Sequence, residues 1–548
     1  MPSIGNIVIS SDRQATASEF WFTVNNPNSV QLGSYVVVEG QNRRIVGLVE
    51  ELVCLSEVDS SSQYLSEQMG PQPRILPTVI RLAKAKILIS DPPTSSPPLE
   101  RWPVRLLDRV DTNLLHRDIP PNKRLLMGFI KNPNGYLPLY AHAEYVIGTQ
   151  AAHTNITGKT GLATKTSYAL FEIMSIMKYA KDVGLDVAVV MFNVKGKDLM
   201  ELHKLPDKNK VEDELRNFAR RIGLDENEIV SLYREALNEG LDQHAFLSDI
   251  KYFTFPNDQF DPSRSGYSNV IHYSYGMCDL NVDDVIAALY RPEEALSQIE
   301  RQTNLIYTYF EEANNLIQNN QITFNNMIDD FRIFSRFWPD RLRVQPIVRL
   351  DDWHPLAAGA VYRRLTAFRS RARNVVKFDR PNGTPINPQA IEPNKINVIQ
   401  IYGLSEAEQR LVVNAVLRSI TEELESGGWV DRVVIFIDEL NKYAPEKTSP
   451  IKEQIVDIAA RGRYVGLSLI GAQQFASQID SQVYGNCSVK VVGVTDDAEL
   501  SKEIYRFLGV FKDAVRMLQK GQLIVYHDLS RSPVIVEFPV PIALSFLG

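Results

Sequence analysis

The sequence predicts an α/β fold in which a parallel β-sheet flanked by helices follows a small N-terminal β-barrel. Two observations predict the sheet. A glycine loop followed by Lys-Thr joins a strand to an apolar helix at 155–172, and fully apolar strands recur at 187–192 and 433–437. Apolar runs without alternation are typical of strands buried on both faces of a parallel sheet. The barrel is predicted by residues 1–90, where several short strands are separated by turn residues.

The composition is that of a globular protein. The chain has 548 residues, 44% of them hydrophobic and 23% charged, which suits roughly two to four domains. No apolar run approaches the roughly 20 residues that span a bilayer, and the start of the chain lacks a signal pattern, so we expect a cytoplasmic protein without membrane contact. The three cysteines match no metal or disulfide spacing. A net charge of −7 argues against a protein that coats DNA, although a ring can confine positive charge to its inner channel.

The chain divides into three predicted parts. Residues 1–145 form the barrel domain, with a proline-rich connector near 90–103. Residues 146–204 and 346–548 form the α/β core. Residues 205–345 interrupt that core as a helical insertion, because they show helical periodicity with acidic helix starts. In the second part of the core, Ser405 and Glu408 have the spacing of a capping box and predict the start of a helix.

The loop at 158–167 has the layout of a phosphate-binding P-loop between a strand and a helix. Glycines let backbone N–H groups turn toward an anion, and the N-terminal end of the helix attracts negative charge. The predicted phosphate-binding residues are Gly158, Lys159, Thr160, Gly161, Leu162, Ala163, Thr164, Lys165, Thr166 and Ser167. In this interpretation Lys165 reaches the β- and γ-phosphates, and the Thr166 hydroxyl binds Mg²⁺.

This loop departs from the standard GxxxxGK[ST] pattern. Gly158 lies seven residues before Lys165 rather than six, and Thr164 replaces the last glycine. An ordinary glycine turn before a helix is the alternative interpretation.

A second motif, "DRVVIFIDELNKYAP" at 431–445, places Asp438 and Glu439 at the end of an apolar strand. Beside a P-loop, Asp438 can hold magnesium and Glu439 can polarise the water that attacks the γ-phosphate. The alternative is an acidic helix start, which the helix dipole favours. Together with the Lys-Thr loop, the pair predicts a nucleotide site.

Two further polar stretches admit more than one interpretation. The strand 187–192 is followed by Asn193, Lys195, Lys197 and Asp198, which lie where α/β sheets place ligand contacts or in a solvated turn. Residues 363–377 hold the densest run of positive charge, which either contacts nucleic-acid phosphates or forms a solvated helix face.

The stretch 453–474 supplies three candidate residues. A helix is expected to end with Arg461 and Arg463, and a strand from 465 to 472 delivers Gln473 and Gln474. Gln473 shares a strand face with residues 467, 469 and 471 and can orient water or contact the γ-phosphate. Arg461 or Arg463 at an exposed turn can reach a neighbouring subunit's nucleotide as an arginine finger. Surface salt bridges are the alternative for both arginines.

In the order and spacing of these blocks, the chain resembles the HerA-type hexameric DNA translocases of the FtsK/HerA branch of P-loop ATPases. The matching blocks are the N-terminal barrel, "HTNITGKTGLATKTS", "FNVKGKD", "IDELNKYAP" and "ARGRYVGLSLIGAQQ". The extra residue in the phosphate loop departs from the usual "GSGKS" form. The resemblance implies a RecA-like core with a barrel of the HerA–ATP-synthase type.

The resemblance also implies a function and a set of roles. Such proteins form homohexamers in which ATP hydrolysis drives double-stranded DNA through the central channel. Lys165 and Thr166 would then bind the phosphates and Mg²⁺, Asp438 the metal, and Glu439 would activate water. Gln473 takes the place of the sensor and Arg461 or Arg463 that of the trans-acting finger, while Lys195 matches a basic residue of the family. Family members pair, through the barrel, with an effector such as a nuclease or a sirtuin-like NADase in DNA-end processing or antiphage defence. A ring scaffold that orders an effector with little translocation is the alternative.

Overall fold

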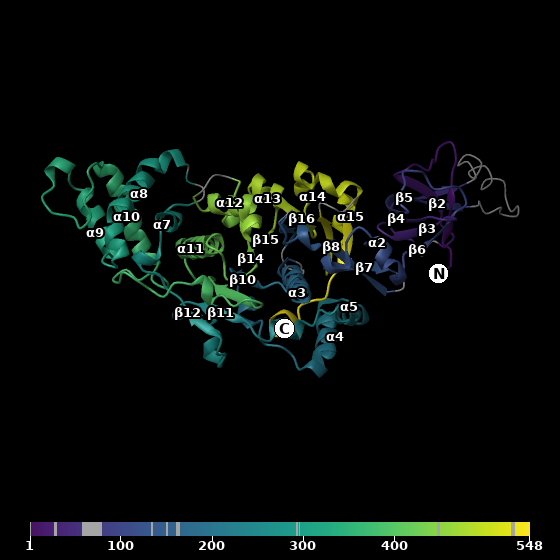
Figure 1. Cartoon of the computed structure of the whole chain (residues 1–548), viewed down its shortest axis with the longest axis horizontal. Coiled ribbons are helices and arrows are strands. Elements are labelled where there is room, and N and C mark those ends of the chain that lie inside the picture. The colour runs from purple at the N-terminus through teal and green to yellow at the C-terminus, as the bar shows by residue number, and fades with distance from the viewer. Residues whose placement is uncertain are drawn as a thin grey trace, which may run out of the picture.

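The computed structural model describes residues 2–26, 30–56, 79–132, 135–149, 152–159, 165–291, 294, 296–446, 450–527 and 532–548. Two β structures organise these residues (Figure 1). One is a closed barrel near the N-terminus, and the other is a twelve-stranded mixed sheet. No helix among the described residues combines the length and the apolar character needed to cross a bilayer.

The predicted barrel is confirmed and closes in the order β1-β2-β5-β4-β3-β6. Its strands are β1 (Gly5–Val8), β2 (Glu19–Thr23), β3 (Tyr35–Glu39), β4 (Arg44–Ser56), β5 (Val79–Asp91) and β6 (Pro103–Leu106). Alternate side chains such as Phe20, Phe22, Val36 and Val38 fill the interior and are fully buried, as the two-residue period of a strand requires. The proline-rich connector near 90–103 thus joins two strands of the barrel, β5 and β6, and does not link the barrel to the core.

The large sheet has the strand order β12-β11-β13-β10-β14-β15-β9-β16-β17-β18-β7-β8. Its parallel strands are β9 (Ala152–Thr157), β10 (Val187–Asn193), β11 (Lys251–Thr254), β12 (Val270–His272), β13 (Ile396–Gln400), β14 (Arg432–Asp438), β15 (Leu467–Gln473) and β16 (Cys487–Val492). Its antiparallel end comprises β7 (Arg124–Asn132), β8 (Gly135–His142), β17 (Gln522–His527) and β18 (Val534–Glu537). The α/β fold class predicted from the sequence is thereby confirmed.

Helices cover both faces of the parallel strands. Figure 1 shows α11 and α12 on one side of these strands and α3 on the other. The helices of the core are α3 (Lys165–Val183), α11 (Glu406–Glu425), α12 (Pro450–Val465), α13 (Ser481–Asn486), α14 (Asp497–Leu500), α15 (Lys512–Met517) and α16 (Leu544–Leu547). The helix α10 (Pro355–Arg371), which the sequence predicts to belong to the core, packs instead against the helices of the 205–345 region. The predicted capping box is confirmed at the start of α11, where Ser405 and Glu408 bond reciprocally to each other's backbone N–H.

Two further parts of the predicted domain division need correction. The hairpin β7–β8 falls within the range predicted for the barrel domain, yet β7 pairs with β18 in the large sheet. The region 205–345 contains the helices α4 (Val211–Ile222), α5 (Glu226–Asn238), α6 (Gln243–Leu247), α7 (Val282–Leu289), α8 (Leu296–Gln318) and α9 (Phe324–Phe334). It also contains β11 and β12, which extend the large sheet beyond β13. Strands of four and three residues are too short to show a period, so helical periodicity dominates the region.

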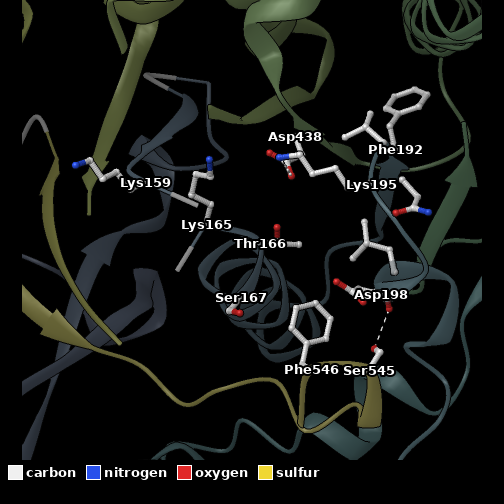
Figure 2. Close-up of a pocket in the computed structure, with 13 residues that line it drawn as sticks. Lys159, Lys165, Thr166, Ser167, Phe192, Lys195, Asp198, Asp438, Ser545 and Phe546 are labelled. Atoms are coloured by element: carbon white, nitrogen blue, oxygen red, sulfur yellow. Dashed lines mark hydrogen bonds and ion pairs between the residues drawn. The ribbon is translucent and has the colours of Figure 1, made fainter. Parts of the chain in front are cut away.

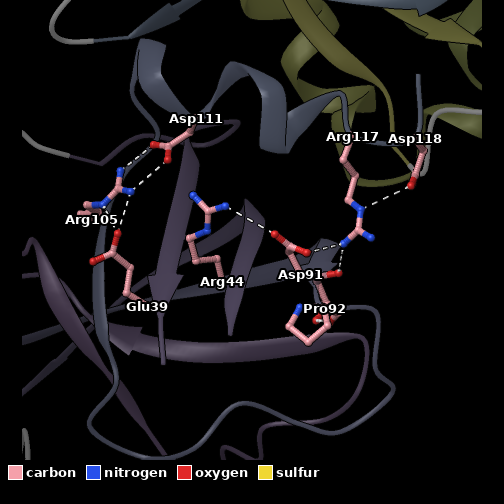
Figure 3. A network of polar contacts seen from close by, with 9 residues as sticks. Glu39, Arg44, Asp91, Pro92, Arg105, Asp111, Arg117 and Asp118 are labelled. Carbon is pink, nitrogen blue, oxygen red and sulfur yellow. Dashed lines mark hydrogen bonds and ion pairs between the residues drawn. The ribbon is translucent and has the colours of Figure 1, made fainter. Parts of the chain in front are cut away.

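Ion pairs connect the barrel to the segment that leads into the core (Figure 3). Arg105 of β6 donates from its two terminal nitrogens to Asp111, at 2.6 and 3.0 Å, and also to Glu39 of β3. Asp111 is buried and precedes α2 (Thr112–Leu115). Arg117, just after α2, donates to Asp91 at the end of β5. A bidentate arginine–carboxylate pair fixes orientation as well as distance, so α2 is held against the barrel at both ends.

Candidate active site

The phosphate loop begins where β9 ends in the middle of the sheet. Gly158 has a φ of +149°, and a Cβ at this position would lie 3.1 Å from the Gly493 backbone. Both facts favour glycine, since other residues rarely adopt this φ. The Lys159 backbone N–H donates to the Val494 carbonyl at 2.8 Å, and the Lys159 side chain pairs with Asp496. Residues Thr160, Gly161, Leu162, Ala163 and Thr164, which the sequence predicts to bind phosphate, lie outside the described residues.

A pocket of about 320 Å³ lies at the carboxyl ends of β9, β10 and β14 (Figure 2). It is lined by Lys159, Lys165, Thr166, Ser167, Phe192, Asn193, Val194, Lys195, Asp198, Leu199, Asp438, Ser545 and Phe546. Predicted site residues from three separate segments of the sequence thus meet in one place. The reason is geometric, because the carboxyl ends of parallel strands lie on the same edge of a sheet.

Lys165 is the first residue of α3 and is only 6% exposed. Burial lowers the pKa of its ammonium group, and the nearby charge of Asp438 opposes part of that effect. A buried cation that has lost much of its hydration binds an incoming anion more strongly than an exposed one. Thr166, the next residue, exposes its hydroxyl to the same pocket.

Asp438 and Glu439 occupy the end of β14 and the turn that follows it. Asp438 is buried and accepts a hydrogen bond from the backbone N–H of Glu439 at 2.8 Å. Glu439 has a left-handed backbone, with φ +54°, which redirects the chain sharply after the strand. Backbone conformations of this kind cost free energy in a non-glycine residue and gather at functional sites.

Lys195, on the loop after β10, pairs with both carboxylates. Its Nζ lies 3.3 Å from Asp438 Oδ2 and 3.0 Å from Glu439 Oε1. Burial alone would lower the pKa of Lys195, but the two carboxylates outweigh burial and raise it. Burial would likewise raise the pKa of Glu439, whereas its pairs with Lys442 and Lys195 lower it below the usual range. Glu439 is therefore ionised at neutral pH and able to accept a proton.

The donor set of this pocket fits a magnesium ion that is shared with phosphate. Asp438 and Thr166 both present oxygen to the pocket, and Mg²⁺ prefers oxygen ligands from one or two side chains, with water and phosphate completing the octahedron. Within the described part of the chain, no group of three or more His, Cys, Asp or Glu side chains forms a metal cluster of its own. Lys195 lies where it can compete with a cation for Asp438.

The two candidate arginines lie at the opposite edge of the sheet. The sequence interpretation placed them at a turn before a strand starting at 465, but α12 continues to Val465 and β15 begins at Leu467. Leu467 pairs with Val433 at the start of β14, whereas Ala472 pairs with Asp438. At roughly 3.3 Å per residue, about 16 Å of strand therefore separates Leu467, near the arginines, from the position of Asp438. Arg461 is 74% exposed and pairs with Asp457, one turn earlier, while Arg463 stacks on the Tyr464 ring.

Gln473 lies at the carboxyl edge of the sheet, beside the phosphate loop, but it does not line the pocket. It pairs with Thr157, the last residue of β9, and its amide nitrogen donates to Asn155 Oδ1 at 2.9 Å in the fully buried interior. Its Oε1 has no hydrogen-bond partner among the described residues. Gln474 is exposed. The sensor role of Gln473 stays a prediction.

Two residues of the pocket carry no sequence signal. Ser545 and Phe546 belong to α16, more than 370 positions after Lys165 in the chain. The extended, proline-containing segment before α16 is visible in the sequence, but no motif there indicates a ligand. Only the path of the folded chain brings these residues to the phosphate loop.

The basic stretch 363–377 spans the second half of α10 and the residues after it. Arg363, Arg369, Arg371 and Arg373 are exposed. Arg364 instead is half-buried, pairs with Glu294 at 2.9 Å and stacks over Tyr290. The exposed arginines remain able to contact phosphates, whereas Arg364 connects α10 to the preceding helices.

Comparison with known proteins identifies the barrel as a recognised domain type. The family model of the HAS barrel domain matches residues 14–81, within the closed barrel. No curated protein matches the sequence.

Solved structures that are similar to parts of the chain include the following three. One is the bacterial conjugative coupling protein TrwB (13% identity, 79% of this chain and 92% of that one, TM-score 0.46). Another is VirB4 of Thermoanaerobacter pseudethanolicus (13% identity, 78% and 100%, TM-score 0.41). The third is the genome packaging NTPase B204 of Sulfolobus turreted icosahedral virus 2 (18% identity, 27% and 69%, TM-score 0.21). TM-scores of this size do not define a fold, so the fold assignment rests on the strand order given above.

Proposed function

We propose that the chain is the subunit of an ATP-hydrolysing, homohexameric motor that binds and translocates double-stranded DNA. The observation that carries the proposal is the meeting of Lys165, Thr166 and Asp438 in one pocket, with Glu439 joined to Asp438 through Lys195. A lysine and a hydroxyl at a helix start, facing a carboxylate at the end of a second strand, suit a nucleoside triphosphate and its metal.

Each side chain then has one role. Lys165 binds the β- and γ-phosphates, and its burial keeps that charge pair strong. Thr166 and Asp438 would hold Mg²⁺, which supplies charge stabilisation to the phosphates when bound. Glu439, ionised and close to the same edge, takes the proton of the attacking water. Its pairs with Lys195 and Lys442 must loosen for that step, since a carboxylate held by two ammonium groups is a weak base.

The remaining roles each involve a second molecule, which is a neighbouring subunit, DNA or an effector. Arg461 or Arg463 acts on the nucleotide of a neighbouring subunit, because the opposite edge of the sheet lies too far from its own pocket. The exposed arginines of α10 and the residues after it contact DNA phosphates. The N-terminal barrel docks a separate effector, a nuclease or a sirtuin-like NADase, in antiphage defence or DNA-end processing.

A ring scaffold is the second candidate function. In this case ATP binding orders the effector complex with little turnover or translocation. The ion pairs that hold Glu439 between Lys195 and Lys442 favour this candidate, as does the altered spacing of the phosphate loop.

Turnover measurements test the motor directly. Light scattering gives the subunit number, and ATP hydrolysis is measured with and without duplex DNA. A motor gives a hexamer whose turnover rises with DNA, whereas a scaffold binds ATP with slow turnover that DNA does not change. Glu439→Gln should keep ATP binding and stop hydrolysis. The exposed Glu446, on the same loop, provides the matched control as Glu446→Gln. Hydrolysis by Glu439→Gln at the wild-type rate would remove the water-activating role.

A further inference from the structure

The last described segment of the chain, residues 538–548, runs from the sheet to the candidate active site. It leaves β18 at Glu537 and packs first on α3, where the Phe538 ring contacts Tyr168 and Phe171 at centroid distances of 5.3 and 5.9 Å. It then reaches α16, whose Ser545 and Phe546 line the pocket. The helix that carries Lys165 is thus contacted by the same segment that closes one side of the pocket.

Hydrogen bonds hold this segment in place along its length. The Gln243 side chain of α6 donates to the Val540 carbonyl and accepts from the Ile542 N–H, both at 3.0 Å. The Leu544 N–H donates to the Lys204 carbonyl at 2.9 Å. The Ser545 hydroxyl donates to the Asp198 carbonyl, also at 2.9 Å (Figure 2). The segment is fixed to α6 and to the turn after β10, so Phe546 is a preorganised part of the pocket wall.

Charged residues are unevenly placed along the pocket. Lys165, Lys195 and Asp438 define the end where the phosphates are expected, whereas Phe546 and Asp198 lie together at the other end (Figure 2). Figure 2 shows the Phe546 ring beside the first turn of α3, on the other side of Thr166 from Asp438. The second aromatic residue of the lining, Phe192, is fully buried within β10 and cannot offer a ring face to a ligand. Phe546 is partly exposed and can.

We propose that Phe546 is the stacking platform for the nucleobase of the bound nucleotide. Bases stack on aromatic side chains because both present flat π faces, and the contact tolerates different bases. The inference rests on the proposed function, since it takes the end with Lys165 and Asp438 as the phosphate site. It adds that segment 538–548 builds the base end and that Ser545 positions the segment by its bond to Asp198. Phe546 is therefore a binding residue, and Ser545 a positioning residue.

The test separates the base from the phosphates by using two probes. The non-hydrolysable analogue ADPNP carries both parts, and inorganic tripolyphosphate carries the phosphates alone. Each is titrated with Mg²⁺ against the full chain by calorimetry. Phe546→Ala should weaken ADPNP by about tenfold or more and leave tripolyphosphate within about twofold. Leu544→Ala is the matched control, because Leu544 lies on the same short helix, is 41% exposed and does not line the pocket.

The outcomes distinguish the two proposals. If wild-type protein binds ADPNP and Phe546→Ala binds it equally well, the platform is overturned and the proposed function stands. Equal losses of ADPNP and tripolyphosphate affinity also overturn the platform, because the ring would then act on the whole site. If wild-type protein binds neither probe, both proposals fall.

A second variant covers the case in which Phe546→Ala does not fold. Phe546→Trp keeps an aromatic face and places an indole at the proposed contact. ADPNP should change the fluorescence of Phe546→Trp beyond the change seen in wild type, and tripolyphosphate should not. Phe546→Trp should also retain affinity for ADPNP, as a stacking role requires. An indole signal that does not respond to ADPNP, although ADPNP binds, would refute the contact.

Discussion

The two edges of the parallel sheet differ in how many interacting side chains a single copy of the chain brings together there. At the carboxyl edge, Lys165, Lys195 and Asp438 come from three segments and face one another across a single pocket. At the amino edge, Arg461 extends into solvent and pairs with Asp457, a neighbour on its own helix. The first edge is a site that is largely assembled within the chain. The second presents charge outward, toward a molecule that the chain itself does not supply.

One strand connects these two edges. β9 runs from Ala152, close enough to Arg463 for its charge to act on His153, to Thr157, which the phosphate loop follows. His153, at its start, has φ +74° and accepts a hydrogen bond from the Leu469 N–H at 3.0 Å. Burial lowers the pKa of His153 to about 4, and the positive charge of Arg463 contributes. The neutral, buried imidazole therefore connects the start of β9 to β15 at the amino edge. The variants that follow test whether the edges have separate roles.

The largest effect is expected from Lys165→Ala at the carboxyl edge. Loss of a buried ammonium that bonds phosphate should weaken ADPNP by about 100-fold or more, since hydrogen bonds between charged groups are among the strongest. Calorimetric titration measures the change. Lys178→Ala is the control, because Lys178 lies on the same helix but is partly exposed and paired with Asp182. Unchanged ADPNP affinity in Lys165→Ala would show that this edge is not the phosphate site.

At the amino edge, loss of an arginine finger should lower turnover and leave nucleotide affinity intact. The expected fall is about 10³-fold for whichever of Arg461→Ala and Arg463→Ala removes the finger. The other variant serves as its control. Steady-state hydrolysis and ADPNP titration are measured on both.

Mixed rings then decide whether the arginine acts between subunits. Subunits with Glu439→Gln still carry both arginines, and subunits with the arginine variant still carry Lys165 and Glu439. Mixing the two inactive proteins should restore part of the hydrolysis if the finger acts in trans. If each arginine variant hydrolyses ATP at the wild-type rate, neither is a finger and the amino edge has no part in turnover.

A smaller effect is expected from Lys195→Ala, which removes the positive charge that pairs with Asp438 and Glu439 at the carboxyl edge. Lys195 helps to hold the pKa of Glu439 low, so the loss of Lys195 should raise that pKa. When turnover is measured as a function of pH, its acid limb should then move to higher pH. Turnover at neutral pH should rise, by no more than about tenfold, because Glu439 loses one of its two ammonium partners and becomes a stronger base. Lys197→Ala is the control, since Lys197 is more than half exposed and pairs with Glu201. An acid limb that does not move would mean that Glu439 is not the group that titrates in turnover.

The carboxyl edge was largely predictable from the sequence, for a physical reason. Strands buried on both faces show as uninterrupted apolar runs, and the polar residues that end them must gather at one edge when the strands are parallel. Lys165 and Asp438 lie in one pocket despite their separation along the chain. The capping box at Ser405 was predictable because both partners lie within one turn. Their catalytic roles stay predictions until the variants are measured.

The parts that could not be predicted depend on long-range pairing. The β7–β8 hairpin gives a clear strand pattern, but its partner β18 lies some 400 positions later, and no local signal selects the large sheet over the barrel. The strands β11 and β12 are too short for a period to emerge among helices. Phe546 reaches the pocket through the path of segment 538–548, which no motif encodes.

The smallest effect on function, with a clear effect on stability, is expected from replacing Glu172, which contacts β9 between the two edges of the sheet. Glu172, in the middle of α3, is fully buried, and Thr154 of β9 donates a hydrogen bond to its Oε1 at 2.5 Å. Burial raises its pKa from 4.5 to about 8, against the opposing effect of that hydrogen bond. The folded protein therefore binds this proton more tightly than the unfolded chain. Below pH 4.5 both states are protonated and the group has no effect on the free energy of unfolding.

As the pH rises from 4.5 toward 8, the unfolded chain loses the proton first, and the free energy of unfolding falls by on the order of 1.4 kcal/mol per pH unit from this group. Glu172→Gln should remove that decline, so that the variant gains stability over wild type as the pH rises, in thermal unfolding followed across this range. Asp182→Asn, at the exposed end of the same helix, should retain the wild-type slope. Because the neutral carboxyl and the amide have nearly the same shape, ADPNP affinity at pH 7 should not change. Parallel melting curves for wild type and Glu172→Gln would mean that the carboxyl is hydrated, and that the layer between the two edges is less tightly packed than the structure indicates.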